Sequence, residues 1–161
     1  MDPVVGSLAN SLDLQGSLVR RAIARLTEED AWRRPATASN SVGWLLGHIA
    51  WSRNHLVAAL GGEPEPLPWA GLFERGASAP EPSACPDTAT LVAALDRIDE
   101  KLKARMATVT DAELSAPSKR ATPFPDKTVR GTAAFLVFHD AYHTGQVGYA
   151  MKLLGQQGLV G

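Results

Sequence analysis

Residues 138–146 read Phe-His-Asp-Ala-Tyr-His-Thr-Gly-Gln and lie inside a longer segment whose apolar residues recur at helical spacing. Within them, His139 and His143 are four residues apart. On an α-helix, side chains at this spacing lie on one face, one turn above the other, so both imidazoles can reach a single metal ion. The stretch therefore predicts a helix and, with it, a metal-dependent function.

The helix around these histidines is predicted to extend from residue 129 to residue 154. Thr128 is a suitable N-cap, and Gly155 follows the end of the pattern. His139 and His143 fall on the apolar stripe of this helix, at positions that an ordinary core gives to Leu or Ala. Burying an imidazole costs on the order of 1 to 3 kcal/mol unless it is hydrogen-bonded, so two on one stripe indicate a shared ligand.

Three further segments show the same helical period, and they span residues 4–26, 42–60 and 88–106. Asn40 or Ser41 can cap the second of these segments, and Asp87 or Thr88 the third. Short extra turns of helix are expected at residues 27–30 and 110–113, where a threonine is followed by acidic residues. The sequence therefore predicts four long amphipathic helices.

Four such helices without a convincing alternating strand predict an all-α fold, a four-helix bundle. Residues 61–87, between the second and third long helices, contain six prolines and cannot form regular helix. A connection of this length can return the chain along the bundle, so that these two helices run parallel, whereas short links favour antiparallel neighbours. The predicted order is up-down-down-up, and the long Pro-rich crossover could also cover one end of the bundle as a lid.

The composition, with 45% hydrophobic and 20% charged residues, is that of one globular domain over residues 1–161. A formal net charge of -1 with both signs interspersed argues against nucleic-acid binding. Neither a run of about 20 apolar residues nor a secretion signal is found, so we expect a cytoplasmic location and no membrane partner. The single cysteine, Cys85, fits a reducing compartment and is interpreted as a loop thiol.

His48 is the third candidate ligand, because it lies on the apolar face of the second long helix and facing helices of a bundle converge in the core. With His139 and His143 it would present three neutral imidazoles at about 2.0 to 2.1 Å from a zinc-like ion, leaving one or more positions open. The remaining histidine, His55, is roughly 10 Å further along the helix axis and is expected at the surface or rim.

Three uncharged ligands leave the charge of a divalent cation uncompensated, which favours an anion in the open position. Hydroxide, carboxylate and thiolate would all be stabilised there. Imidazole ligands suit zinc, nickel, iron and copper. We expect one divalent transition metal, zinc or nickel in the first place and iron in the second.

The neighbours of His48 on its own helix predict an aromatic pocket. Trp44 precedes it by four residues and Trp51 follows it by three, so indole rings are expected to flank the imidazole. Both tryptophans could line a binding pocket in front of the ion.

Polar residues on the last helix are candidates for supporting the ligands. Gln146 follows His143 by three residues and could orient its ring, and Tyr142 follows His139 by three residues and could hold a phenol nearby. Each could instead serve only in packing or lie on the surface. Asp140 is rotated by about 100° from His139 and is expected to point away from the metal, as a supporting or exposed residue.

Two motifs of the chain resemble the DinB-like superfamily, also called the damage-inducible family. They are Asn-Ser-Val-Gly-Trp-Leu-Leu-Gly-His-Ile-Ala-Trp at residues 40–51 and the stretch at residues 138–146, and residues 26–35 also resemble the first inter-helix connection of that family. The resemblance covers nearly the whole chain. It implies an up-down-down-up bundle, a divalent metal held by three histidines that map onto His48, His139 and His143, and frequent homodimers.

The resemblance also implies a thiol chemistry, since characterised relatives include isomerases and S-transferases that use mycothiol or bacillithiol. The leading hypothesis is a thiol-dependent S-transferase or related small-molecule enzyme, hydrolases included, with a low-molecular-weight thiol and an electrophilic small molecule as partners. Two alternatives stay open: a non-enzymatic, stress-associated bundle whose metal joins two helices, and a metal-free dimeric helical protein. A fourth protein ligand would mark a structural site, and an open position a catalytic one.

Overall fold

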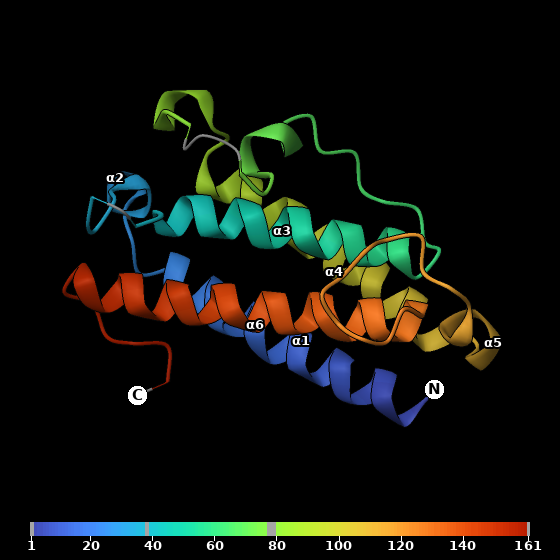
Figure 1. Cartoon of the computed structure of the whole chain (residues 1–161). Helices are drawn as coiled ribbons and strands as arrows, with labels where there is room; N and C mark the ends of the chain where they lie inside the picture. The colour runs from blue at the N-terminus through green and yellow to red at the C-terminus, as the bar shows by residue number, and fades with distance from the viewer. Residues whose placement is uncertain (1, 38, 77–79, 161) are drawn as a thin grey trace.

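Four long helices make up most of the molecule, whose computed structural model describes residues 2–37, 39–76 and 80–160 (Figure 1). The long helices are α1 (Pro3–Ile23), α3 (Val42–Ala59), α4 (Thr88–Thr108) and α6 (Val129–Leu153). The connections contain α2 (Glu28–Trp32), α5 (Asp111–Ser115) and two 3-10 turns, η1 (Ala70–Phe73) and η2 (Pro82–Ala84). Within these ranges there is no strand, and β pairing is limited to an isolated bridge between Pro117 and Thr128.

The helix directions are those of an up-down-down-up bundle. Figure 1 shows α1 and α6 running one way and α3 and α4 running the other way. α3 packs against both α4 and α6, and α1 packs against α6. The long connection between α3 and α4 returns along α3, and η1 packs on this helix (Figure 1). The predicted all-α four-helix bundle is therefore confirmed.

Each long helix begins at a side chain that accepts a hydrogen bond from a first-turn amide, and these caps are Asp2, Ser41, Asp87 and Thr128. α1 ends at Ile23, earlier than the predicted Leu26. The amides of Arg25 and Leu26 donate to carbonyls three residues back, so the chain leaves the helix through a tight turn. In the described part of the chain, no helix is long and apolar enough to cross a membrane.

A buried guanidinium lies at the centre of the bundle. Arg53 of α3 is 2% exposed, and its Nε and Nη2 donate to the two carboxylate oxygens of Asp140 on α6 at 3.0 and 2.9 Å. Its Nη1 donates to Asp99 of α4 at 2.7 Å, and Nη2 also donates to the carbonyl of Leu12 on α1 at 3.0 Å. Burial disfavours the charged form, but the two carboxylates outweigh it and raise the pKa of Arg53. One side chain thus joins all four long helices.

Replacing Arg53 by Met should destabilise the metal-free protein strongly. The substitution leaves Asp140, which is 1% exposed, without its cationic partner, and breaking a buried pair in this way costs about 3 to 5 kcal/mol. Urea unfolding followed by circular dichroism measures the loss.

The matched control is Arg33→Met, which removes an exposed ion pair with Asp30, a residue only three positions away in the sequence. Such a pair contributes at most about 1 kcal/mol. Equal unfolding free energies for the two variants would contradict the structural role assigned to Arg53.

Candidate metal centre

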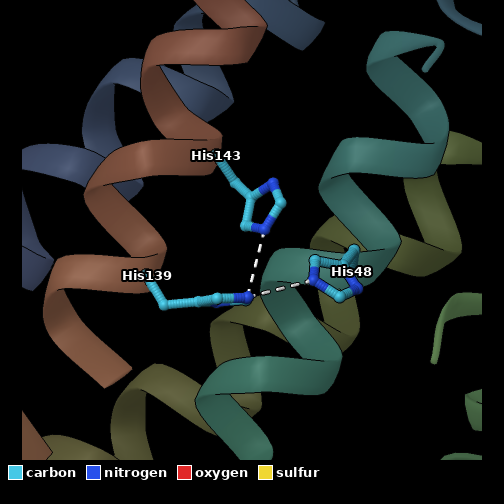
Figure 2. Close-up of side chains that lie close together, drawn as sticks. All are labelled: His48, His139 and His143. Atoms are coloured by element: carbon cyan, nitrogen blue, oxygen red, sulfur yellow. Dashed lines mark hydrogen bonds between the residues drawn. The ribbon is translucent and has the colours of Figure 1, made fainter. Parts of the chain in front are cut away.

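Three imidazoles converge between α3 and α6. His48 projects from the middle of α3, and His139 and His143 project from successive turns of α6, so that the three rings point toward one another (Figure 2). The Nε2 atom of His139 lies 3.4 Å from Nε2 of His48 and 3.1 Å from Nε2 of His143. Taking one ligand atom from each ring, all three atoms lie within 4.8 Å of one another.

The second nitrogen of each ring, Nδ1, forms a hydrogen bond with another group of the protein. Nδ1 of His48 lies 2.6 Å from the carbonyl oxygen of Phe73 in η1, and Nδ1 of His143 lies 2.8 Å from Oε1 of Gln146. A carbonyl oxygen can only accept, so Nδ1 donates the proton and Nε2 keeps its lone pair. The Nε2 amide of Gln146 donates to the Tyr142 hydroxyl at 3.2 Å, which orients its own Oε1 toward the ring.

His139 has an equivalent partner on the facing helix. Its Nδ1 lies 3.1 Å from the hydroxyl of Ser52, which can accept the Nδ1 proton. Ser52 lies one turn after His48 on α3, so the same helix carries a ligand and the support for another ligand. All three rings therefore have a protein partner at Nδ1 and direct Nε2 to a common point.

The rings are neutral at neutral pH. Burial lowers the pKa of His48 and of His143 below the ordinary value. For His139, burial is again the largest cause, and the charges of His143, His48, Arg120 and Arg75 add to it, lowering the pKa to about 4. Neutral imidazole is the form that binds metals.

Three lone pairs directed at one point repel one another unless a cation lies between them. For nitrogen ligands at about 2.0 to 2.1 Å from an ion in octahedral or tetrahedral geometry, neighbouring nitrogens are about 2.8 to 3.4 Å apart. The two distances from His139, 3.1 and 3.4 Å, fit this range. Among residues 2–37, 39–76 and 80–160, no carboxylate or thiol joins the group. The donor set fits a divalent metal with three protein ligands.

The cluster opens on a cavity of about 520 Å³. Its lining includes aromatic, polar and cationic side chains: Trp44, Trp51, Phe135, Tyr142, Ser52, Arg75 and Arg120, in addition to the three histidines. Trp44 and Trp51 stack on the His48 ring, with centroids 4.9 and 5.2 Å away and interplanar angles of 11° and 21°. Tyr142 is 57% exposed and lies at the solvent side of the cavity. The structure thus brings together the seven residues predicted from the sequence: six of them line the cavity, and Gln146 contacts His143 without lining it.

Asp140 differs in part from its prediction. Its carboxylate is directed to Arg53, consistent with a position away from the metal, but it is only 1% exposed rather than accessible. The reason is that α6 packs against α1 as well as against α3, so turning away from the histidine face leads into the bundle interior. His55 is half-buried, with its ring edge against Trp51, and stays outside the cluster.

Sequence reasoning missed the support of His48 and the cations of the cavity. The support is a backbone carbonyl, which no side-chain pattern reveals. Gly47 was the available signal, because a Cβ at this position would collide with the ring of Phe73, so the glycine lets η1 lie directly on α3. Arg75 and Arg120 come from irregular connections without periodicity, which gave no signal.

Metal uptake should depend on the three clustered histidines. We expect His139→Ala and His143→Ala, alone or combined, and His48→Ala to lose the bound metal, because each removes one of only three nitrogen donors. Elemental analysis after dialysis against zinc or nickel measures the stoichiometry.

His55→Ala is the control, since this histidine lies on α3 but outside the cluster, and it should retain the wild-type metal content. Full occupancy in the His139→Ala/His143→Ala double variant would remove the proposed ligand set.

The stability of the metal-free protein should fall as the pH decreases from 6.5. In the unfolded chain a histidine has an ordinary pKa of 6.5, whereas the folded value for His139 is about 4, so between these values the unfolded state binds more protons. The free energy of unfolding therefore rises with pH in this window. Urea titrations between pH 7.5 and 5 measure the slope, which His139→Gln should reduce. A stability that is constant or higher at pH 5 contradicts the burial of neutral rings.

Comparisons with known proteins agree with this architecture. The chain is similar to a conserved protein from Enterococcus faecalis, with a TM-score of 0.75 and 18% identity over 96% of this chain and 98% of that one. It is also similar to YfiT from Bacillus subtilis, described as a probable metal-dependent hydrolase with an unusual four-helix bundle topology. This match has a TM-score of 0.67 and 18% identity, covering 95% of this chain and 89% of YfiT. At these identities the likeness shows a common fold.

The sequence itself matches a family model. No curated protein gave a significant match. The model of the DinB superfamily, however, matches residues 11–147, which include both histidine motifs. The resemblance inferred from these motifs is thereby confirmed, and the chain belongs to the DinB superfamily.

Proposed function

We propose that the protein is a metal-dependent enzyme that transfers a low-molecular-weight thiol to an electrophilic small molecule. The observation that carries this proposal is the set of three unprotonated Nε2 atoms, without a fourth protein ligand in the described ranges, at the floor of a cavity of about 520 Å³. A structural site is closed by protein, whereas a site that serves chemistry leaves room for a reactant.

The roles of the side chains follow from their positions. His48, His139 and His143 would hold the ion, which when bound favours the anionic form of a thiol or of water at neutral pH. Ser52 and Gln146 keep the Nδ1 protons in place and so keep Nε2 available.

The cavity wall has a separate role. Trp44 and Trp51 flank the His48 ring and exclude water from it on two sides. Exclusion of water strengthens the electrostatic interactions at the cluster, and the aromatic rings offer apolar contact to an organic reactant.

The lining of the cavity favours a thiolate over water as the nucleophile. The described lining residues include no carboxylate, so no Asp or Glu is positioned to take a proton from water or to give one to a leaving group. A thiolate requires neither proton transfer. It attacks carbon and forms a C–S bond while the bond to the leaving group breaks, and the leaving group departs as a stable anion such as halide. The lack of a carboxylate among the described lining residues thus supports thiol transfer.

Hydrolysis is the second candidate function. It is favoured by the similarity to YfiT, which is described as a probable metal-dependent hydrolase. Three neutral imidazoles would suit an activated water as well as a thiolate.

The homodimer and the cytoplasmic location expected from the sequence stay predictions.

A panel assay separates these candidates. The protein, loaded with zinc or nickel, is supplied with mycothiol, bacillithiol or cysteine and a chlorinated aromatic electrophile, and conjugate formation is measured. We expect turnover that requires one of the thiols and disappears with a chelator and in the His139→Ala variant, because both remove the ion.

A parallel assay with neutral and anionic esters measures hydrolysis. Ester hydrolysis without conjugation would replace thiol transfer by the second candidate. Full metal content with neither reaction would instead favour the non-enzymatic bundle in which the ion joins α3 to α6.

A further inference from the structure

Two arginines from separate connections lie at the same cavity. Arg75 follows η1 in the crossover between α3 and α4, and Arg120 lies in the connection between α5 and α6. Both line the cavity that contains the three histidines. The chain therefore brings two cations, 45 positions apart in sequence, to the cavity of the candidate metal ligands.

Neither cation is neutralised by the part of the chain that the structure describes. The ion pairs within these residues include neither Arg75 nor Arg120. The cavity lining contains no Asp or Glu, and the nearby Asp140 is committed to Arg53. Among the described residues, no carboxylate therefore pairs with either arginine at the cavity.

The charges of these arginines act at one of the candidate metal ligands, His139. Both lower the pKa of His139, in addition to the larger effects of burial and of the other two histidines. Burial is the largest cause that lowers the pKa of His55; the charge of Arg120 lowers this pKa further, and the charge of the exposed Glu74 raises it. The positive charge of the arginines is therefore felt at His139, whereas the carboxylate of Asp140 acts in the opposite sense at His48 and His143.

The remaining lining is aromatic. Trp44, Trp51 and Phe135 give the cavity apolar walls, and the two tryptophans stack on the His48 ring. A ligand that matches this surface has an apolar body for the walls and a negative group for the guanidinium ions, which pair with carboxylate or phosphate through two parallel hydrogen bonds. Neutral and cationic small molecules lack the second feature.

We propose that Arg75 and Arg120 bind the carboxylate or phosphate group of an anionic organic substrate, while its apolar part lies against the tryptophans. This inference rests on the proposed function, because it assigns the substrate class of the same cavity. The arginines are specificity-determining residues: they select and orient the substrate by a group remote from the reacting atom.

Binding of matched probes tests the proposal without any turnover. The probes are 4-nitrobenzoate, 4-nitrophenyl phosphate and the neutral 4-nitrobenzamide, titrated into the full-length protein in metal-loaded and metal-free form. Quenching of tryptophan fluorescence reports occupancy, because Trp44 and Trp51 line the cavity. We expect both forms of the protein to prefer the anions over the amide.

Removing the arginines should remove this preference. Arg75→Gln and Arg120→Gln are each expected to weaken anion binding about threefold, and the double variant about tenfold, with no change for the amide. The anion that loses more affinity in the double variant shows whether the arginines favour a carboxylate or a phosphate group. Arg21→Gln is the control, because Arg21 is an exposed residue of α1 outside the cavity lining, and this variant should bind all three probes as the wild type does.

Two results would overturn the proposal. One is equal affinity for 4-nitrobenzoate and 4-nitrobenzamide in the wild-type protein. The other is an anion preference that does not depend on the arginines, because it persists in the double variant or exists only in the metal-loaded form. Because none of these titrations requires a reaction, a failure here is distinct from a failure of the thiol-transfer proposal.

Discussion

The ion pair between Arg53 and Asp140 is the constraint on which the arrangement of the bundle depends. The Arg53 side chain contacts Asp140 on α6, Asp99 on α4 and the Leu12 carbonyl on α1, so a buried charge fixes four helices at one level. Asp140 directly follows His139 in the chain, and the ion pair therefore also sets how far α6 can slide along α3. A slide of one turn would separate the ligands and leave a charge unpaired.

In the three-histidine cluster, which depends on this fixed register, the two nitrogens of each imidazole have different roles. Nδ1 is committed to Phe73, Ser52 or Gln146, and Nε2 is left for a ligand. Burial keeps the rings uncharged, so their lone pairs are available at neutral pH. The donor set is thus prepared in the folded chain, with the protein supplying the orientation that a metal alone could not impose.

The sequence predicted what depends on local spacing. Helical period and capping residues gave the four long helices, and the i, i+4 pair His139 and His143 gave the cluster, because these features act within one helix. It did not predict the exposure of Asp140, which depends on α1 covering that side of α6. The sequence did not predict the Phe73 carbonyl or the two cavity arginines either, since only tertiary folding of irregular connections brings them to the site.

We infer that α3 and α6 together hold one metal ion through three Nε2 atoms. An anomalous difference map from crystals of the metal-loaded protein, recorded at the absorption edge of the metal, measures this directly. We expect a single strong peak at about 2.0 to 2.1 Å from Nε2 of His48, His139 and His143, with the remaining position facing the cavity. A peak at another place, such as Cys85, or an ion held by a fourth protein ligand would contradict it.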